Sequence, residues 1–335
     1  MEDKSMRRAR ITGVGHYAPP RVVTNFDLEK MMDTSDEWIR ERTGIVERRW
    51  VDEDTATSDL AAEASKKALQ MAELKPEEID FIIFATLSPD YYFPGSGCLL
   101  QHKLGINHIG ALDVRNQCCG FIYGLSIADQ YIRTGTYNKI LLVGAEVQSK
   151  GLNLSTEGRD VAVLFGDGAG AVVIEPTDED RGILSTHLHA DGRFATELCV
   201  EYPGSAAPQG ATHQMLNEER FFPKMNGREV FKHAAIRFPQ VIQEALEANG
   251  FCTQDIGLII PHQANLRISE AMRTRLGLPP EKVYNNIQRY GNTTAASIPI
   301  ALSEALSEGR IQDNDMVILA AFGSGFTWAS AAIRW

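Results

Sequence analysis

The chain contains two copies of one segment, and this internal repeat limits the folds that it can adopt. Residues 67–80 align without a gap on residues 244–257, and each copy reads as the end of a helix, an acidic turn and the start of a strand. In a second correspondence, Cys118 lies 17 residues before Gly135 and Asn292 lies 17 residues before Gly309, with a helical pattern in both intervals. A repeat this long indicates a duplicated α/β unit with pseudo-twofold symmetry rather than a solenoid.

A polar run at residues 176–181 marks the join between the two copies. We therefore predict an N-terminal half, residues 1–178, and a C-terminal half, residues 179–335. Helices are predicted at 58–73, capped near Ser58, and after a cap at Thr34 or Ser35. The nearly continuous apolar runs within 79–86 and 139–147 are typical of strands buried on both faces of a parallel sheet. Further strands are predicted at 8–16 and 165–174.

Composition and charge narrow the function classes. The chain has 335 residues, 44% of them hydrophobic, so it can bury a large core. Its formal net charge of −11 argues against non-specific binding of nucleic acid, which needs a basic surface. No apolar run approaches the roughly 18 residues of a membrane helix, and the N-terminus lacks the apolar region of a signal peptide. We expect a cytoplasmic protein that binds neither membrane nor nucleic acid.

The cysteines and histidines do not form a recognisable metal or disulfide pattern. Five cysteines, an odd and small number for this length, fit a reducing compartment better than a disulfide scaffold. No Cys-x-x-Cys motif occurs, and the pair His187 and His189 has no third ligand near it in the sequence. We therefore expect no metal site.

Residues 113–125 turn from a strand into a helix at a pair of cysteines, Cys118 and Cys119. Apolar residues precede the pair from Ile109, and from Phe121 onward they recur at helical spacing. Backbone N–H groups at a helix start are unpaired and the helix dipole favours negative charge there, so we expect a lowered pKa for a cysteine at this position. Because the thiolate is the nucleophilic form of cysteine, the segment predicts a covalent catalytic site.

Two further residues occupy comparable positions. His262 follows an apolar strand, at the carboxyl edge where parallel sheets bind ligands, and Asn292 lies in a turn that opens a helix of small residues. Each has an ordinary alternative, because buried cysteines are mostly packing, a lone histidine is often a core residue and Gly-Asn is a common turn. Their joint position at related edges of a duplicated fold favours a catalytic site.

A binding module is the alternative raised by the glycine-rich segment 165–170. The segment matches neither Gly-x-Gly-x-x-Gly nor the P-loop, which needs Gly-Lys followed by Ser or Thr. Its glycines are better explained as backbone that passes close behind an active site.

Five motifs, in order along nearly the whole chain, resemble the ketoacyl-ACP synthase III family of condensing enzymes in the thiolase-like superfamily. They are Asp36–Ile39 with Arg42–Ile45, Cys118–Phe121, Phe165–Ala171, Pro261–Asn265 and Gly291–Thr293. The resemblance implies a five-layered αβαβα thiolase-like α/β fold and a homodimer. It also implies a triad of Cys118, His262 and Asn292, and it assigns Cys119, where the family usually has alanine or serine, to packing.

The resemblance further implies a condensation in two steps. Cys118 would take an acyl group from an acyl-CoA, and a malonyl thioester, malonyl-ACP or malonyl-CoA, would then lose CO2. His262 and Asn292 would donate hydrogen bonds to the enolate oxygen, and the backbone N–H groups of Cys118 and Ser324 would hold the acyl oxyanion. Acyl-CoA is a substrate, so no cofactor is expected.

Residues that contact substrates and partners also come from the resemblance. CoA and substrate contacts are expected at Trp38, Arg42, Thr43, Arg159, Arg228, Phe231 and Asn265. A basic patch for the acidic acyl carrier protein is expected at Lys232, Arg267, Arg273 and Arg275, with a solvated helix face as the alternative for Arg273 and Arg275. Arg228 stands where the family commonly has asparagine. Phe93 is expected to gate the partner subunit's tunnel.

Because of three segments, the sequence does not identify the preferred acyl group. Residues 193–224 exceed the corresponding family loop, and residues 89–92 and 115–117 are reminiscent of branches that make secondary metabolites, including quinolone-type condensing enzymes. An enzyme of fatty-acid initiation is the main prediction. A secondary-metabolite condensing enzyme, or an acyltransferase or thioester hydrolase of the same fold, is the alternative.

Overall fold

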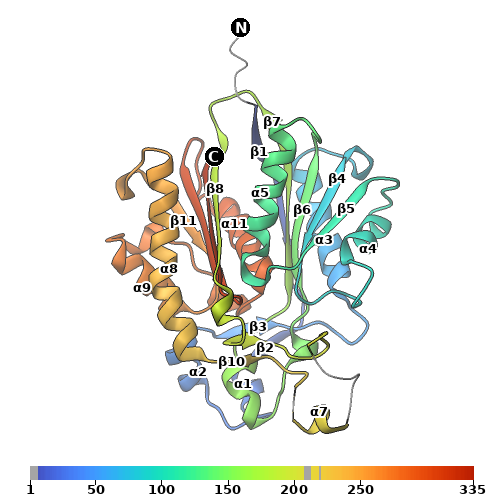
Figure 1. Ribbon diagram of the computed structural model, residues 1–335, viewed down its shortest axis with the longest axis vertical. Helices are drawn as coiled ribbons and strands as arrows, with labels where there is room; N and C mark the ends of the chain where they lie inside the picture. The colour runs from blue at the N-terminus through green and yellow to red at the C-terminus, as the bar shows by residue number, and fades with distance from the viewer. Residues whose placement is uncertain (1–6, 207–212, 219) are drawn as a thin grey trace.

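In the computed structural model, which describes residues 7–206, 213–218 and 220–335, two main sheets lie side by side (Figure 1). The first has the strand order β1-β7-β6-β4-β5 and the second the order β11-β12-β13-β8. The strands of the first sheet are β1 (Arg8–Tyr17), β4 (Phe81–Ala85), β5 (Gly110–Val114), β6 (Ile140–Glu146) and β7 (Gly168–Thr177). Those of the second are β8 (Gly182–Ala190), β11 (Leu258–Pro261), β12 (Met316–Gly323) and β13 (Thr327–Arg334).

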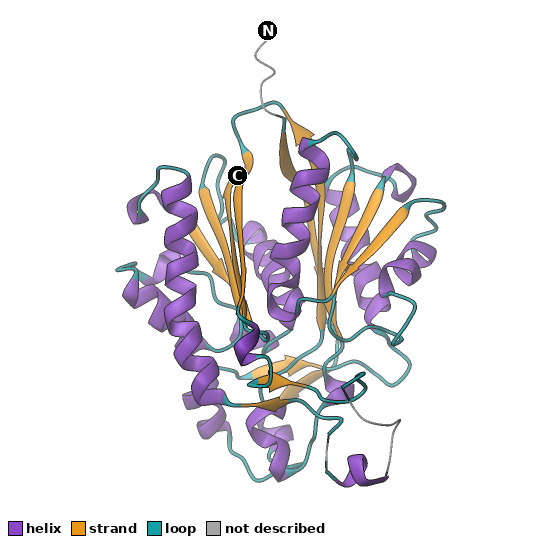
Figure 2. Cartoon of the chain, viewed as in Figure 1, coloured by secondary structure: helices purple, strands orange, loops and turns teal. Residues whose placement is uncertain are grey.

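Helices cover both outer faces and fill the space between the sheets (Figure 2). The helices α3 (Thr57–Met71) and α4 (Ser96–Lys103) lie outside the first sheet, and α8 (Gly227–Ala248) and α9 (Leu266–Arg275) outside the second. Between the sheets lie α5 (Gly120–Arg133) and α11 (Ser297–Ser307). The predicted αβαβα order of five layers is therefore confirmed.

The shorter elements surround one end of the sheets. Two small sheets pair β2 (Val22–Thr24) with β3 (Glu47–Arg49) and β9 (Leu198–Cys199) with β10 (Lys224–Met225). The short helices are α1 (Asn25–Leu28), α2 (Asp36–Thr43), α6 (Arg159–Ala162), α7 (His213–Asn217) and α10 (Ile287–Tyr290). Two 3-10 turns matter for the site: η2 (Gln117–Cys119) and η8 (Thr294–Ala296). Within the described ranges, no helix is both long and apolar enough to cross a membrane.

The two halves repeat one strand arrangement. In the first half β4 pairs in parallel with β6, which pairs antiparallel with β7, which pairs antiparallel with β1. In the second half β11, β12, β13 and β8 pair in the same order with the same directions. The sheets are therefore mixed rather than parallel throughout. β7 ends at Thr177 and β8 begins at Gly182, so the chain changes sheets inside the polar run at 176–181.

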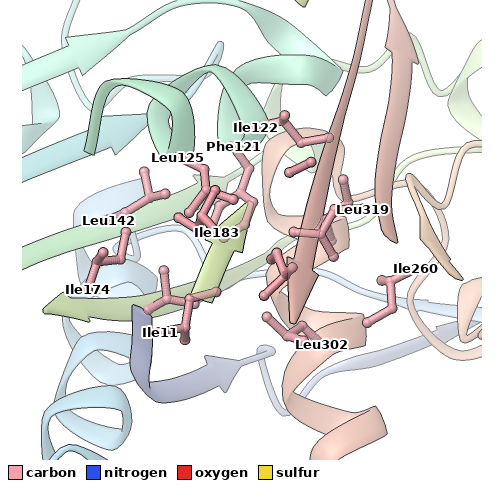
Figure 3. Packing of buried hydrophobic residues seen from close by; sticks show 14 of the residues in the cluster. Ile11, Phe121, Ile122, Leu125, Leu142, Ile174, Ile183, Ile260, Leu302 and Leu319 are labelled. Carbon is pink, nitrogen blue, oxygen red and sulfur yellow. The ribbon is translucent and has the colours of Figure 1, made fainter. Parts of the chain in front are cut away.

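The central layer is apolar on both faces because it packs between two sheets. Phe121, Ile122 and Leu125 of α5 and Leu302 of α11 are completely buried. In Figure 3 these side chains converge with residues from strands of both sheets, including Leu319 of β12. Burying a large apolar side chain is worth roughly 1.5–3 kcal/mol, so this layer fixes where both helices begin.

The N-cap predicted from the sequence is found at α2 but not at α3. The Ser35 hydroxyl accepts a hydrogen bond of 3.1 Å from the Trp38 N–H, so Ser35 caps α2 as predicted. The prediction of a cap near Ser58 was wrong. Ala56 is the N-cap of α3, and the Ser58 hydroxyl instead donates to the Asp90 carboxylate at 2.6 Å. That contact anchors α3 to the loop that follows β4.

A glycine in β1 allows α3 to approach the first sheet closely. A Cβ added at Gly13 would lie 2.1 Å from the Ala68 carbonyl oxygen, so we expect Gly13→Ala to lower the free energy of unfolding by about 1–3 kcal/mol through overpacking. Gly151→Ala is the matched control, because a Cβ there has no neighbour within 4 Å. Denaturant titration measures both variants, and equal stabilities would contradict this account of the β1–α3 contact.

Candidate active site

A cavity of about 550 Å³ is lined by residues of both halves of the chain. It lies where α2, the start of α8 and the end of β12 meet. Its lining residues are Trp38, Arg42, Thr43, Cys118, Asp160, Val163, Leu164, Phe165, Leu198, Met225, Gly227, Arg228, Val230, Phe231, Ala234, Phe238, His262, Ala264, Asn265, Arg267, Ile268, Asn292, Phe322 and Gly323. The structure therefore brings Cys118, His262 and Asn292, which are far apart in the sequence, to the wall of one cavity.

Cys118 is presented on a strained turn. It lies in η2, directly before α5, and the preceding residue Gln117 has φ of 42°, in the left-handed region that few non-glycine residues adopt. The end of β12 packs against it, because a Cβ added at Gly323 would lie 2.5 Å from the Cys118 Cβ. Only a residue without a side chain fits between this strand and the cysteine.

The prediction of a lowered Cys118 pKa was wrong. The side chain is almost fully buried, and this desolvation raises the pKa of the thiol above its ordinary value. The neighbouring Cys119 and the carboxylate of Glu146 raise it further, while backbone hydrogen bonds from Ser324 and from Cys118 itself act in the opposite direction. The thiol is therefore protonated in the resting protein. Burial also raises the pKa of Cys119, to about 12, in the apolar core behind it.

His262 follows β11 and lines the cavity, with one ring nitrogen held by a serine. Nδ1 is 2.6 Å from the Ser297 hydroxyl, which also accepts a hydrogen bond from the Gln263 N–H at 3.3 Å. Nε2 is buried and has no hydrogen-bond partner among the described residues. Burial lowers the pKa of His262 to about 3, so the imidazole is neutral near pH 7.

Asn292 is oriented by its own turn. The Thr294 N–H donates to the Asn292 Oδ1 at 2.9 Å, which leaves Nδ2 as the donor group available to the cavity. The Asn292 N–H donates to the Leu164 carbonyl at 2.7 Å, and the Gly166 N–H donates to the Asn292 carbonyl at 3.1 Å. The glycine-rich segment of the first half thus holds the asparagine turn of the second.

The turn after β12 brings Ser324 beside the cysteine. The backbone N–H groups of Ser324 and of Cys118 itself donate hydrogen bonds to Cys118 Sγ. The Ser324 hydroxyl donates to the Leu198 carbonyl, which connects this turn to β9 and so to the loop that lines the cavity. Two backbone N–H groups therefore lie within hydrogen-bonding reach of the sulfur.

Trp38 and two arginines meet at the cavity's edge. The guanidinium of Arg159 lies 5.2 Å from the Trp38 ring centroid and that of Arg42 lies 5.7 Å from it. Arg159 is not among the lining residues; it donates to the Asp33 carbonyl at 2.7 Å beside the tryptophan. A half-buried aromatic ring flanked by positive charges can bind an aromatic group attached to phosphates.

Other predicted contacts are partly used by the fold itself. Asn265 caps α9, accepting a hydrogen bond from the Arg267 N–H, and its amide donates to the Arg42 carbonyl at 2.9 Å. The Thr43 hydroxyl donates to the Ile39 carbonyl at 2.6 Å. Arg228 lines the cavity, as does Phe231, which lies under the guanidinium of Arg267.

The residues predicted to dock the carrier protein differ from one another in their contacts. Lys232 forms an ion pair of 3.1 Å with Glu229, and Arg273 one of 2.8 Å with Glu270. Arg273 also donates to the Leu278 carbonyl, so part of its role is to close the end of α9. Arg275 is exposed at the end of the same helix.

Phe93 is not among the residues that line the cavity, and it is 80% exposed. Tyr91 and Tyr92 beside it are also exposed. Part of the long predicted loop at 193–224, residues 207–212 and 219, lies outside the described residues.

The sequence analysis missed the polar residues behind the cavity. Glu146 is the last residue of β6 and Gln148 follows it, and Thr294 and Ser297 follow Asn292. A signal for Glu146 existed, because a carboxylate that ends the apolar run 140–145 is expected to be buried and hydrogen-bonded. In the part of the chain that the structure describes, no group of three His, Cys, Asp or Glu side chains is arranged to hold a metal ion. His187 and His189 instead both contact Glu244.

Comparison with known proteins agrees with this fold. The family models "3-Oxoacyl-[acyl-carrier-protein (ACP)] synthase III" and its C-terminal counterpart match residues 112–192 and 246–335. A β-ketoacyl-[acyl-carrier-protein] synthase III of Caldanaerobacter subterraneus is 49% identical over 327 residues, covering 98% of both chains.

Two solved structures are similar over nearly the whole chain. The 3-oxoacyl-[acyl-carrier-protein] synthase III of Aquifex aeolicus has a TM-score of 0.90 and 43% identity, covering 98% of this chain and 100% of the other. The priming β-ketosynthase of the R1128 polyketide pathway has a TM-score of 0.88 and 31% identity, covering 97% and 96%.

The fold and the residues at the cavity define a condensing enzyme of the thiolase-like class. Within that class, the chain belongs to the 3-oxoacyl-[acyl-carrier-protein] synthase III family. The family and the condensing activity predicted from the sequence are therefore confirmed.

The raised pKa of Cys118 makes its reactivity depend on pH. Below the pKa the thiolate fraction grows about tenfold per pH unit, so alkylation by iodoacetamide should be slow near pH 7 and rise about tenfold per unit to about pH 9. Peptide mass spectrometry separates Cys118 from the exposed Cys98, which serves as the internal control. A rate at Cys118 that is high and flat across this range would instead indicate a resting thiolate.

Proposed function

We propose that this protein is an acyltransferase that loads Cys118 from an acyl-CoA and then condenses the acyl group with malonyl-ACP, as in the initiation of fatty-acid synthesis. The observation that carries the proposal is the meeting of Cys118, His262 and Asn292 at one buried cavity, with Trp38 and its two arginines at the edge. The proposed location is cytoplasmic. We propose no resident cofactor, since acyl-CoA is a substrate.

In the loading step, the Cys118 sulfur attacks the thioester carbonyl and the carbon–sulfur bond to CoA breaks. The proton of the resting thiol ends on the departing CoA sulfur, so the step needs no net proton. The backbone N–H groups of Cys118 and Ser324 are proposed to stabilise the oxyanion of the tetrahedral intermediate. A covalent acyl-enzyme divides one difficult condensation into two easier steps.

In the second step, the malonyl thioester loses CO2, and negative charge develops on its carbonyl oxygen. Asn292 Nδ2 is a suitable donor because the Thr294 N–H already occupies Oδ1. His262 Nε2 is the second proposed donor. Since Ser297 accepts from the Gln263 N–H, its hydroxyl proton can be donated to Nδ1, which puts the imidazole proton on Nε2. The enolate carbon then attacks the acyl group on Cys118.

The CoA arm is proposed to bind along the line of predicted contacts. Trp38, Arg42 and Arg159 would hold the nucleotide end, with Thr43 beside them. Arg228, Phe231 and Asn265 would follow the pantetheine inward, and the partly apolar wall of α8 suits an uncharged chain.

For the acidic carrier protein we propose docking beside this entrance, on Lys232, Arg267, Arg273 and Arg275. Arg267 lines the cavity and lies on the same helix as Arg275, so a carrier bound there could deliver its prosthetic arm.

We also propose a homodimer. β5 is an edge strand of the first sheet, and the Asp113 carboxylate on it accepts hydrogen bonds from the Ser96 and Gly97 N–H groups, next to the loop that exposes Phe93. A neighbouring subunit that covers this apolar residue would explain its exposure in the single chain, and Phe93 would then gate the neighbour's tunnel.

A condensing enzyme of secondary metabolism is the second candidate, favoured by the similarity to the R1128 priming β-ketosynthase. Both candidates share the chemistry described above. They differ in the acyl group and in the carrier, which the test below separates.

Intact-protein mass spectrometry after incubation with acyl-CoAs from acetyl to dodecanoyl should reveal one chain-length class that leaves an adduct. Cys118→Ala should show no adduct, while the matched variant Cys119→Ala should keep it because Cys119 packs in the core. An adduct on Cys119 would contradict the assignment of the nucleophile.

Addition of malonyl-ACP or malonyl-CoA tests the second step. His262→Ala and Asn292→Ala should still acylate but release CO2 about 10²–10³-fold more slowly, the usual cost of a lost oxyanion donor. Release of the acyl group as free acid, without CO2, would favour the hydrolase alternative.

Trp38→Ala should raise the KM for acyl-CoA about tenfold through the loss of ring stacking, with little change in kcat. Trp38→Phe keeps a ring between the arginines and should recover part of the affinity. Equal KM values for all three proteins would remove Trp38 from the proposed CoA site.

A further inference from the structure

Glu146 is a completely buried carboxylate at the end of β6 that joins the two halves of the chain. It accepts hydrogen bonds from the Leu87 N–H at 3.2 Å, the Ser88 N–H at 3.1 Å and the Ser88 hydroxyl at 2.5 Å. From the second half it accepts one from the Ala295 N–H at 3.4 Å. A buried charge is retained only with such partners, so Glu146 holds the η8 turn against the first sheet.

Gln148 extends this contact to the asparagine turn. Its Nε2 lies 3.4 Å from a Glu146 oxygen and donates to the Thr294 hydroxyl at 3.0 Å. Thr294 in turn donates its N–H to Asn292 Oδ1 at 2.9 Å. A chain of hydrogen bonds therefore runs from Glu146 through Gln148 and Thr294 to Asn292.

The backbone at Thr294 is held in an uncommon conformation. Its φ of 50° lies in the left-handed region, which is strained for a β-branched residue and persists only where the surroundings determine it. The surroundings here are close. A Cβ added at Gly144 of β6 would lie 2.3 Å from the Ala295 carbonyl oxygen, so the η8 turn lies directly on the strand.

We propose that Glu146, Gln148 and Thr294 are positioning residues that hold the Asn292 amide with Nδ2 toward the cavity, and that they support decarboxylation but not the loading of Cys118. The inference rests on the proposed role of Asn292 as a donor to the enolate oxygen. A flipped amide would place the Thr294 N–H against the amide's own NH2 group and would turn a carbonyl oxygen toward the developing negative charge.

Thr294→Val tests the proposal most directly, because valine keeps the shape and the backbone N–H but removes the hydroxyl that Gln148 contacts. CO2 release from malonyl thioester should fall about tenfold to a hundredfold, less than for complete loss of the donor, while acylation stays within about threefold. Thr294→Ser restores the hydroxyl and should recover most of the rate. Gln148→Leu should show the same selective loss; Glu146 is left unchanged because its carboxylate also raises the pKa of Cys118.

A second comparison separates positioning from general damage. In an Asn292→Ala background, Thr294→Val should have no further effect on CO2 release, because residues that act through one group are not additive. A parallel loss of acylation and decarboxylation, an undiminished effect in the Asn292→Ala background, or no effect of Thr294→Val would each overturn the proposal.

The outcomes also distinguish this inference from the proposed function. If Asn292→Ala slows CO2 release but Thr294→Val does not, only the positioning role fails. If Asn292→Ala keeps the full rate, the proposed role of Asn292 fails and the positioning role fails with it.

Discussion

The close approach of the two central helices to the sheets is the constraint on which the site depends. Cys118 lies two residues before the start of α5, and Asn292 precedes α11 by one short turn. Both helices are buried between the sheets, so neither can move without disturbing an apolar layer on two sides. At Gly144 and Gly323 the strands carry no side chain, and the turns that bear the two polar residues pack directly against the backbone. The duplication thus supplies two equivalent helix starts, and the core holds them at one cavity.

Burial favours the uncharged forms of Cys118 and His262. It keeps the Cys118 thiol protonated and keeps His262 neutral. Groups that are neutral at rest avoid the cost of holding charge away from water. The proposed reaction then brings the charge with the substrate, as an enolate that forms among fixed donors, where low polarity strengthens each hydrogen bond. The positive charges lie at the edge of the cavity, where Arg42 and Arg159 flank Trp38.

Much of this arrangement could be predicted from local patterns. The repeat of residues 67–80 at 244–257 gave the order of elements in both halves, and the motifs around Cys118, His262 and Asn292 marked the residues that now line one cavity. The pKa of Cys118 could not be predicted, because its burial comes from Gly323 at the end of a strand far along the chain. The link from Glu146 to Thr294 likewise crosses between the halves, and no local spacing reveals it. The cap of α3 was mispredicted because Ser58 bonds to Asp90 in a distant loop.

The buried thiol of Cys118 also bears on how the protein ages. Peroxide attacks the thiolate far faster than the thiol, and the first oxidation product is rescued most readily when a second thiol can condense with it. Burial keeps the Cys118 thiol protonated, and burial likewise keeps the neighbouring Cys119 a thiol that condenses slowly with an oxidised sulfur. The burial that keeps the sulfur protonated until a thioester arrives therefore also slows its reaction with peroxide.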